Sequence, residues 1–192
     1  TRLLMRTLRR LRVPTLLFVN KIDRGGADHD RVLREIAAKL TPSIVAMGST
    51  RELGTREAAF VPLGPAETAG LTEALADHDD DLLTCYVAGA TAPYGRLLDA
   101  LAAQTRRVVV HPVFFGSAVT GAGVDALMGG ITTLLPAEEG DVERPLSGTV
   151  FKVERGPAGE KIAYVRVFSG VVRTRDRLRD DCKVTAISVF DR

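Results

Sequence analysis

The chain has 192 residues, a formal net charge of +2, 45% hydrophobic and 26% charged side chains, 18 glycines and no tryptophan. This composition is typical of a folded protein of one or two domains and excludes a disordered chain, a collagen and a disulfide scaffold. No apolar run approaches the roughly 20 residues that cross a bilayer, so we expect a cytoplasmic protein without membrane contact. The small net charge does not by itself predict a nucleic-acid partner. Any partner has to be inferred from local sites.

The two cysteines predict neither a disulfide nor a zinc site. Cys85 and Cys182 lie nearly a hundred residues apart and match no C-x-x-C spacing, so we expect two free thiols and no metal ligands. No other residues suggest a nucleophile or an acid/base pair, and the sequence therefore gives no catalytic residue. Because the chain starts without methionine and stops after a strand-like run, we expect it to be an internal piece of a longer protein.

The first 40 residues predict an α/β unit. Residues 1–12 place Leu4, Leu8 and Leu11 at the spacing of one helix face. Residues 15–19 form a continuous apolar run, typical of a strand covered on both faces of a parallel sheet. The segment that follows returns to helical spacing up to residue 40. The order is helix, strand, loop and helix.

A second strand, loop and helix lie before a proline at position 136. Residues 108–115 carry the strongest strand signal, which we expect Pro112 to break, and an apolar helix pattern follows. Between the two units we interpret residues 41–107 as an insertion. It contains two short strand candidates (43–47 and 59–63) and two predicted helices (71–88 and 94–106).

The last part of the chain predicts a separate all-β domain. Residues 1–136 form the α/β domain, residues 137–144 a charged linker and residues 145–192 the start of a β-barrel. Three strand-like runs follow the linker (146–153, 161–169 and 183–190). Three strands cannot close a barrel, so we expect this part to be incomplete.

The tip of the first strand carries residues suited to guanine. Asn20, Lys21 and Asp23 follow the apolar run, where ligands bind in open α/β sheets. A carboxylate at Asp23 can accept hydrogen bonds from N1–H and the N2 amine of guanine, a pair that adenine lacks. Asn20 can bond the N7 or O6 edge and hold the loop, and the stem of Lys21 can cover the base. The alternative is a solvated loop.

The tip of the later strand carries a second candidate. Gly116, Ser117 and Ala118 are small, so the backbone can approach a ligand. An amide of Ser117 or Ala118 could donate to guanine O6, whereas the amine of adenine would clash with that donor. Alternatively, Ser117 and Thr120 only cap the next helix.

These two motifs resemble those of the translational GTPases. Residues 20–23 resemble the guanine-specificity motif of that family, and residues 116–118 resemble its last nucleotide-binding motif. Gly121 stands where the family often has asparagine. The amino-acid sequence of residues 163–171 most resembles that of the ribosomal protection proteins of tetracycline resistance, with elongation factor G as the alternative. The resemblance implies GTP or GDP as ligand, the ribosome as partner and a monomer.

The phosphate site of such a GTPase is not found in this sequence. None of the five lysines follows a glycine as in G-x-x-x-x-G-K-[ST]. The resemblance therefore implies that the intact protein binds Mg²⁺ through residues outside this sequence. We expect the chain alone not to catalyse hydrolysis and to bind GTP weakly.

Two other functions are open at this point. Residues 121–126 satisfy G-x-G-x-x-A, the dinucleotide fingerprint, but Glu138 or Glu139 falls in the linker after Pro136 and not at the tip of a second strand. A non-catalytic module could instead bind ribosomal RNA or ribosomal protein through arginines. Those arginines stand near the start of the chain (Arg2, Arg6, Arg9, Arg10 and Arg12) and in the β segment (Arg173, Arg175, Arg177 and Arg179).

Overall fold

The computed structural model describes residues 1–136, 140–178 and 183–189. The chain divides into two compact units, Thr1–Pro136 and Ala137–Arg192. Cys182, Arg179, Glu138 and Glu139 lie outside the described residues. Within the described residues, no helix combines the length and the apolar character that a bilayer crossing needs.

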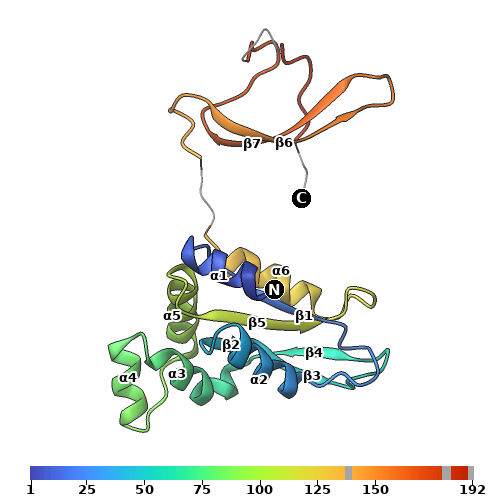
Figure 1. The fold of residues 1–192 in the computed structure, drawn as a ribbon. Coiled ribbons are helices and arrows are strands. Elements are labelled where there is room, and N and C mark those ends of the chain that lie inside the picture. Colours follow the sequence, from blue (N-terminus) through green and yellow to red (C-terminus); the bar gives the residue numbers. More distant parts are fainter. Residues whose placement is uncertain (137–139, 179–182, 190–192) are drawn as a thin grey trace. The chain divides into compact units, whose positions relative to one another are not determined.

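The first unit is built on a three-stranded parallel sheet in the order β1-β5-β2 (Figure 1). The strands are β1 (Leu17–Asn20), β5 (His111–Gly116) and β2 (Ile44–Ala46). Each residue of the central strand β5 is buried. The register pairs Asn20 with Gly116, so the loops that follow β1 and β5 start side by side.

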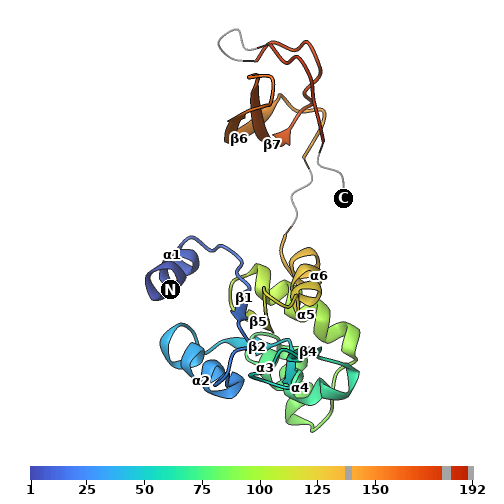
Figure 2. The ribbon, with the colours of Figure 1, turned by 90° about the vertical axis from the view of Figure 1, so that its right-hand side faces the viewer.

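Helices cover both faces of this sheet. In β5, Val113 and Phe115 pack with Ile36 of α2 (His29–Lys39), whereas Phe114 packs on the other face with α5 (Tyr94–Arg106) and α6 (Val124–Leu134). Alternate strand residues point to opposite faces, which produces these two apolar clusters. Figure 2 shows α2 on one side of the sheet and α5 and α6 on the other.

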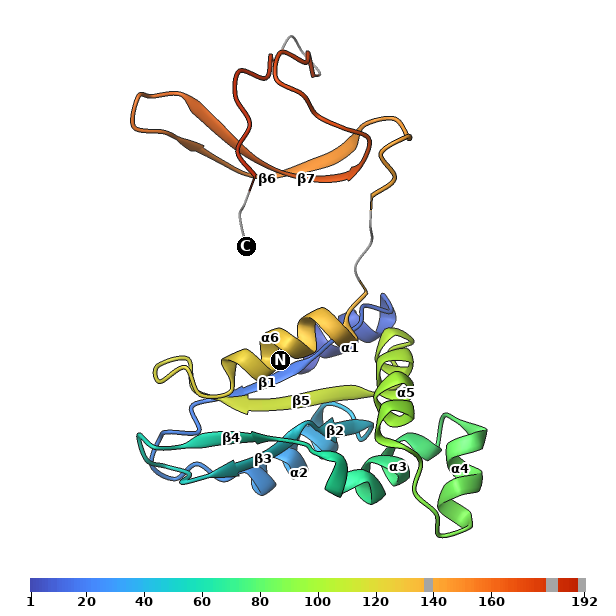
Figure 3. The same cartoon turned by 180° about the vertical axis from the view of Figure 1, so that it is seen from behind.

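The segment interpreted as an insertion contributes directly to the central sheet. β2 pairs in parallel with β5 and is therefore a sheet strand. The next two strands, β3 (Gly48–Arg51) and β4 (Ala59–Pro62), form an antiparallel hairpin. A one-turn helix, η1 (Pro65–Glu67), leads from this hairpin into α3 (Thr68–Ala76). Figure 3 shows the hairpin below β5 in that view.

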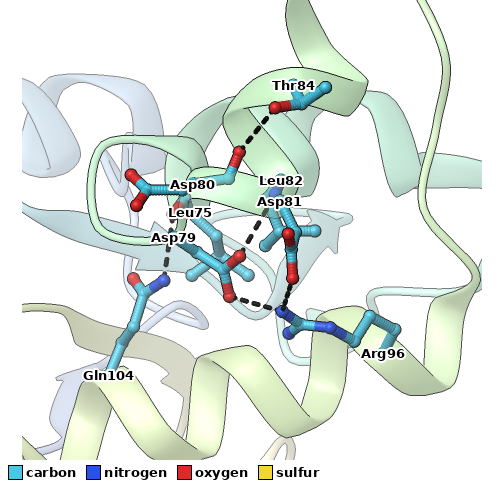
Figure 4. A network of polar contacts seen from close by, with 8 residues as sticks. All are labelled: Leu75, Asp79, Asp80, Asp81, Leu82, Thr84, Arg96 and Gln104. Atoms are coloured by element: carbon cyan, nitrogen blue, oxygen red, sulfur yellow. Dashed lines mark hydrogen bonds and ion pairs between the residues drawn. The ribbon is translucent and has the colours of Figure 1, made fainter.

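The single helix predicted for residues 71–88 is wrong, because the segment forms two helices. α3 ends at Ala76 and α4 spans Asp80–Val87. The Asp79 side chain caps α4 by accepting from the Leu82 N–H at 3.1 Å, and it also contacts Arg96 Nη2 of α5 at 2.7 Å (Figure 4). Burial raises the pKa of Asp79, but the hydrogen bonds from Arg96 and Leu82 outweigh it and hold the pKa below its ordinary value.

Figure 4 also shows how α3 is held to α5. Gln104 is buried on α5, and its Nε2 donates to the carbonyl oxygen of Leu75 at 2.9 Å. That carbonyl belongs to the last turn of α3 and also accepts from the His78 N–H at 3.3 Å. The amide of Gln104 therefore adds a second donor to this carbonyl and links α5 to the end of α3.

The predicted strand 108–115 begins three residues later than expected. Val108 has a φ of 62° and its N–H donates to the Thr105 carbonyl, so it still belongs to the end of α5. Pro112 does not break the strand. His111 and Val113 hydrogen-bond toward β2, which leaves the proline nitrogen on the β1 side, where pairing begins only at Leu17 with Val113. No ladder hydrogen bond is lost.

The helix predicted for residues 1–12 forms as α1 (Arg2–Arg10), and its regularly spaced leucines lie largely at the surface. Leu4 and Leu11 are 61% and 62% exposed, whereas Met5 is buried. Helical spacing identifies an apolar stripe but not the neighbour against which it packs.

The second unit contains one described hairpin, β6 (Ser147–Arg155) paired with β7 (Lys161–Ser169). The third predicted strand, 183–190, is not formed in its described part, residues 183–189. Beyond a bridge between Arg177 and Lys183, this run has no strand partner there, and a strand requires one. The barrel is not established by this hairpin.

Candidate functional site

The loops after β1 and β5 are joined by backbone and side-chain hydrogen bonds. The Ile22 N–H donates to the Gly116 carbonyl at 3.2 Å. Asn20 Oδ1 accepts from the Lys21 N–H at 2.8 Å and from the Ala118 N–H at 3.0 Å. One side chain thus fixes both predicted motifs, and its Nδ2 donates to no other described residue.

The first loop leaves one carboxylate oxygen without a partner. Lys21 has a φ of 72°, a left-handed conformation that is uncommon for a residue with a side chain. Its side chain is exposed, whereas Ile22 turns into the core. Asp23 is half-buried, and its Oδ1 is buried with no hydrogen-bond partner among the described residues. Such an oxygen is costly unless a ligand donor satisfies it.

The second loop uses Ser117 for its own structure. Ser117 is fully buried, its N–H donates to the Ala122 carbonyl at 2.9 Å and its Oγ accepts from the N–H groups of Val119 and Thr120, each at 3.3 Å. The Ser117 amide hydrogen is therefore already used within the loop. Ala118 is exposed, and its N–H contacts only Asn20 Oδ1.

Two glycines make the second loop sterically possible. A Cβ at Gly123 would lie 2.1 Å from the Phe115 carbonyl oxygen, and its φ of 74° disfavours other residues. A Cβ at Gly116 would lie 2.3 Å from the Ala122 oxygen. Gly121 has a φ of 82° but open space around it, and asparagine also adopts this conformation. The departure from asparagine at this position therefore preserves the turn.

A third segment, the turn between β3 and β4, contacts the first loop and was not predicted from the sequence. The Gly54 N–H, in the turn between β3 and β4, donates to the Ile22 carbonyl at 2.8 Å. A Cβ at Gly54 would lie 3.5 Å from the Arg24 carbonyl oxygen. The β3–β4 hairpin thus supports the loop that carries Asp23. Only the glycine itself marked this turn, and a lone glycine does not identify its contact.

The geometry does not support the dinucleotide fingerprint. In that motif a glycine permits close approach of the ligand phosphates. Gly123 instead faces the backbone of Phe115, so its missing side chain serves packing within the chain. Among the described residues, no group of three or more histidine, cysteine, aspartate or glutamate side chains is arranged to hold a metal ion.

Comparison with known proteins gives consistent matches. Residues 1–137 match the family model described as the elongation factor Tu GTP binding domain. The oxytetracycline resistance protein of Streptomyces rimosus is 51% identical over 92% of this chain and 27% of its own length. The tetracycline resistance protein TetM of Streptomyces lividans is 42% identical over 93% of this chain and 28% of its own length.

A solved structure also matches this chain over most of its length. A crystal structure of a protein from Thermus thermophilus superposes with a TM-score of 0.65 and 26% sequence identity, covering 88% of this chain and 29% of that one. The chain thus spans between a quarter and a third of the length of these relatives.

Proposed function

The chain belongs to the family of elongation factor Tu GTP-binding domains, and from this premise we propose that its two loops bind the guanine base of GTP and GDP. The observation that carries the proposal is the buried, unpartnered Oδ1 of Asp23. It lies in the loop that Asn20 joins to Ala118.

Each residue has a distinct role in this proposal. Asp23 accepts from N1–H and the N2 amine of guanine, and Asn20 Nδ2 donates to N7 or O6. The Ala118 N–H donates to O6, sharing its hydrogen with Asn20 Oδ1, which it already contacts. Lys21 covers the base with its methylene stem. Ser117 acts indirectly, because its buried hydroxyl shapes the loop that presents Ala118.

This arrangement discriminates against adenine. Adenine offers no pair of donors to Asp23, so the carboxylate would stay buried and unsatisfied. Sites built around such a bond discriminate by about 10⁴-fold or more. Because phosphates and Mg²⁺ are held by residues that this sequence does not supply, we propose that the chain alone binds GTP weakly and does not hydrolyse it.

For the whole protein we propose a ribosome-dependent GTPase that protects the ribosome from tetracycline. The proposal rests on the names of the relatives, the oxytetracycline and tetracycline resistance proteins. In it, GTP hydrolysis resets a monomeric, cytoplasmic factor after drug release. Residues 145–192 would contribute the first strands of a β-barrel domain.

The base-recognition role is tested by Asp23→Asn in the intact protein. An asparagine matches xanthine, which carries an oxygen at C2, so we expect the preference to move from GDP to xanthosine diphosphate in a competition binding assay. The matched control is Asp99→Asn on an exposed part of α5, which should keep the GDP preference. An unchanged preference in Asp23→Asn would refute the assigned role.

The whole-protein role is tested with ribosomes carrying labelled tetracycline. We expect the intact protein with GTP to release the drug, and Asp23→Asn to do so only with xanthosine triphosphate. Stimulation of translocation without drug release would instead establish an elongation-type factor. This second result would leave the guanine site intact and overturn only the resistance function.

A further inference from the structure

A basic groove lies among α1, the end of α2 and the end of α5, all within the first unit. Its volume is about 1040 Å³. Eight of its lining residues are basic, namely Arg2, Arg6, Arg9, Arg10, Arg12, Lys39, Arg106 and Arg107. The remaining lining residues are Ala38, Leu40, Val108 and Val109.

The charges of this unit are strongly segregated. Residues 1–136 contain 15 lysines and arginines and 14 aspartates and glutamates. Eight of those cations line the groove and none of the acids does. An almost neutral unit therefore presents one concentrated positive surface, which a composition average conceals.

Ion pairs within the described residues do not neutralise the groove arginines. Lys39 contacts Glu35 at 2.6 Å, and Arg106 donates to the Thr133 carbonyl at 3.2 Å. Within the described residues, the five arginines from α1 to position 12 have no carboxylate within ion-pair distance. Four of the cations, Arg9, Arg10, Lys39 and Arg106, lie in the last turns of α1, α2 and α5, where a helix C-terminus attracts positive charge. Arg2 and Arg6 lie outside the last turn of α1.

We propose that this groove binds the phosphate backbone of double-helical RNA. Arg2, Arg6 and Arg9 recur at helical spacing on α1, and at 1.5 Å per residue they extend over about 10 Å. A DNA duplex presents about one phosphate charge per 1.7 Å of its axis. An RNA duplex likewise carries one phosphate per nucleotide on each strand, so several phosphates lie within that length. A guanidinium group can bind a phosphate through two parallel N–H···O hydrogen bonds.

The lining favours RNA over an acidic protein and over single strands. Protein interfaces have an apolar and aromatic centre, whereas this groove is mainly cationic and contains no aromatic residue. Single-stranded nucleic acids are held by stacking on aromatic side chains. A groove without them recognises the backbone, so we expect little dependence on RNA sequence.

The test is binding of a fluorescent RNA hairpin to the chain by anisotropy at several salt concentrations. Arg2→Gln/Arg6→Gln/Arg9→Gln should weaken binding at least tenfold and make the slope of log K against log salt shallower by about two to three. The matched control is Arg34→Gln/Arg51→Gln/Arg56→Gln, which removes three exposed arginines outside the groove. It should bind within about threefold of the unaltered chain.

Three further measurements make the outcome decisive. Arg2→Lys/Arg6→Lys/Arg9→Lys keeps the charges and should retain binding within a few-fold, and circular dichroism melting establishes that each variant is folded. Equal losses in the groove and control variants would overturn the proposed location. Absence of RNA binding, or equally tight binding of polyglutamate, would overturn the ligand. None of these results depends on the guanine site.

Discussion

The side-chain oxygen of Asn20 accepts a hydrogen bond from the Ala118 N–H although 98 positions separate the two residues. The register of β1 against β5 makes this possible, because it places Asn20 beside Gly116. Parallel strands end at the same edge of a sheet, so loops from distant parts of the sequence meet there. The Asn20 side chain is therefore a structural tie through Oδ1 as well as a proposed binding group through Nδ2.

Asn20→Ala should lower the free energy of unfolding by about 1 kcal/mol, the typical net value of a lost hydrogen bond. Asn20→Asp keeps an oxygen acceptor for the two amides and should lose less. Both variants lack the Nδ2 donor, so in the intact protein both should bind GDP more weakly. Urea unfolding and nucleotide titration check the two effects separately. Equal stability of Asn20→Ala and the unaltered chain would contradict the structural role.

The glycines of the second loop should differ in their tolerance to substitution. Gly123→Ala should cost about 2–4 kcal/mol, because the new Cβ would meet the Phe115 carbonyl in a left-handed conformation. Gly121→Asn should change stability by less than about 1 kcal/mol, since asparagine tolerates that conformation and the space is open. Urea unfolding of the two variants provides the comparison. A larger loss at position 121 would disprove this account of the loop.

The start of α4 should depend on Asp79 and hardly on its neighbour Asp81. Asp79→Ala removes the cap and the contact with Arg96, and should cost about 1–2 kcal/mol. Asp79→Asn keeps a capping oxygen and should cost less. Asp81 is 92% exposed and 3.9 Å from Arg96, so Asp81→Asn serves as the control and should be nearly neutral. Thermal melting of the three variants tests this order.

Stability should fall as pH decreases because of His111. Burial lowers the pKa of His111, the charge of Arg9 lowers it further and a backbone hydrogen bond with Thr15 partly offsets both. The unfolded chain therefore takes up the proton first. The stability that neutral His111 contributes is fully present above the pKa of about 6.5 of the unfolded chain, and it is lost as pH falls below that value.

The measurement for His111 is the melting temperature between pH 8 and pH 5. His111→Gln should flatten the decline below pH 6.5, since glutamine does not titrate. His78 is exposed on the α3–α4 turn, and His78→Gln should leave the decline unchanged. A steep decline that persists in His111→Gln would assign it to other groups.

The sequence predicted the strand tips well because their signal is local. An apolar run followed at once by Asn20 and Asp23 has few structural alternatives in an α/β fold. It could not predict that β2 joins β5, since a three-residue strand carries almost no pattern and its partner lies at positions 111–113. The break at Asp79 was missed for a related reason: its carboxylate acts both as a cap and as a partner of Arg96, and only the second role depends on the fold.

The basic groove likewise could not be predicted from local sequence. Helical spacing identified the arginines of α1, but Lys39 and Arg106 join them only through the packing of three helix ends. Spatial charge clusters of this kind are a property of the tertiary structure. The net charge of +2 gave no indication of this cluster.

The hydrogen bond from Gly54 to the Ile22 carbonyl makes the β3–β4 turn a reporter on the loop that we propose binds the base. Deuterium can replace the Gly54 amide hydrogen only when the hairpin and the loop separate. A nucleotide that holds Asp23 in place would slow this separation, so the exchange rate of one glycine amide would measure occupancy from the far side of the loop. Exchange at Gly54, in a hairpin to which we assign no contact with the base, would thereby report nucleotide binding.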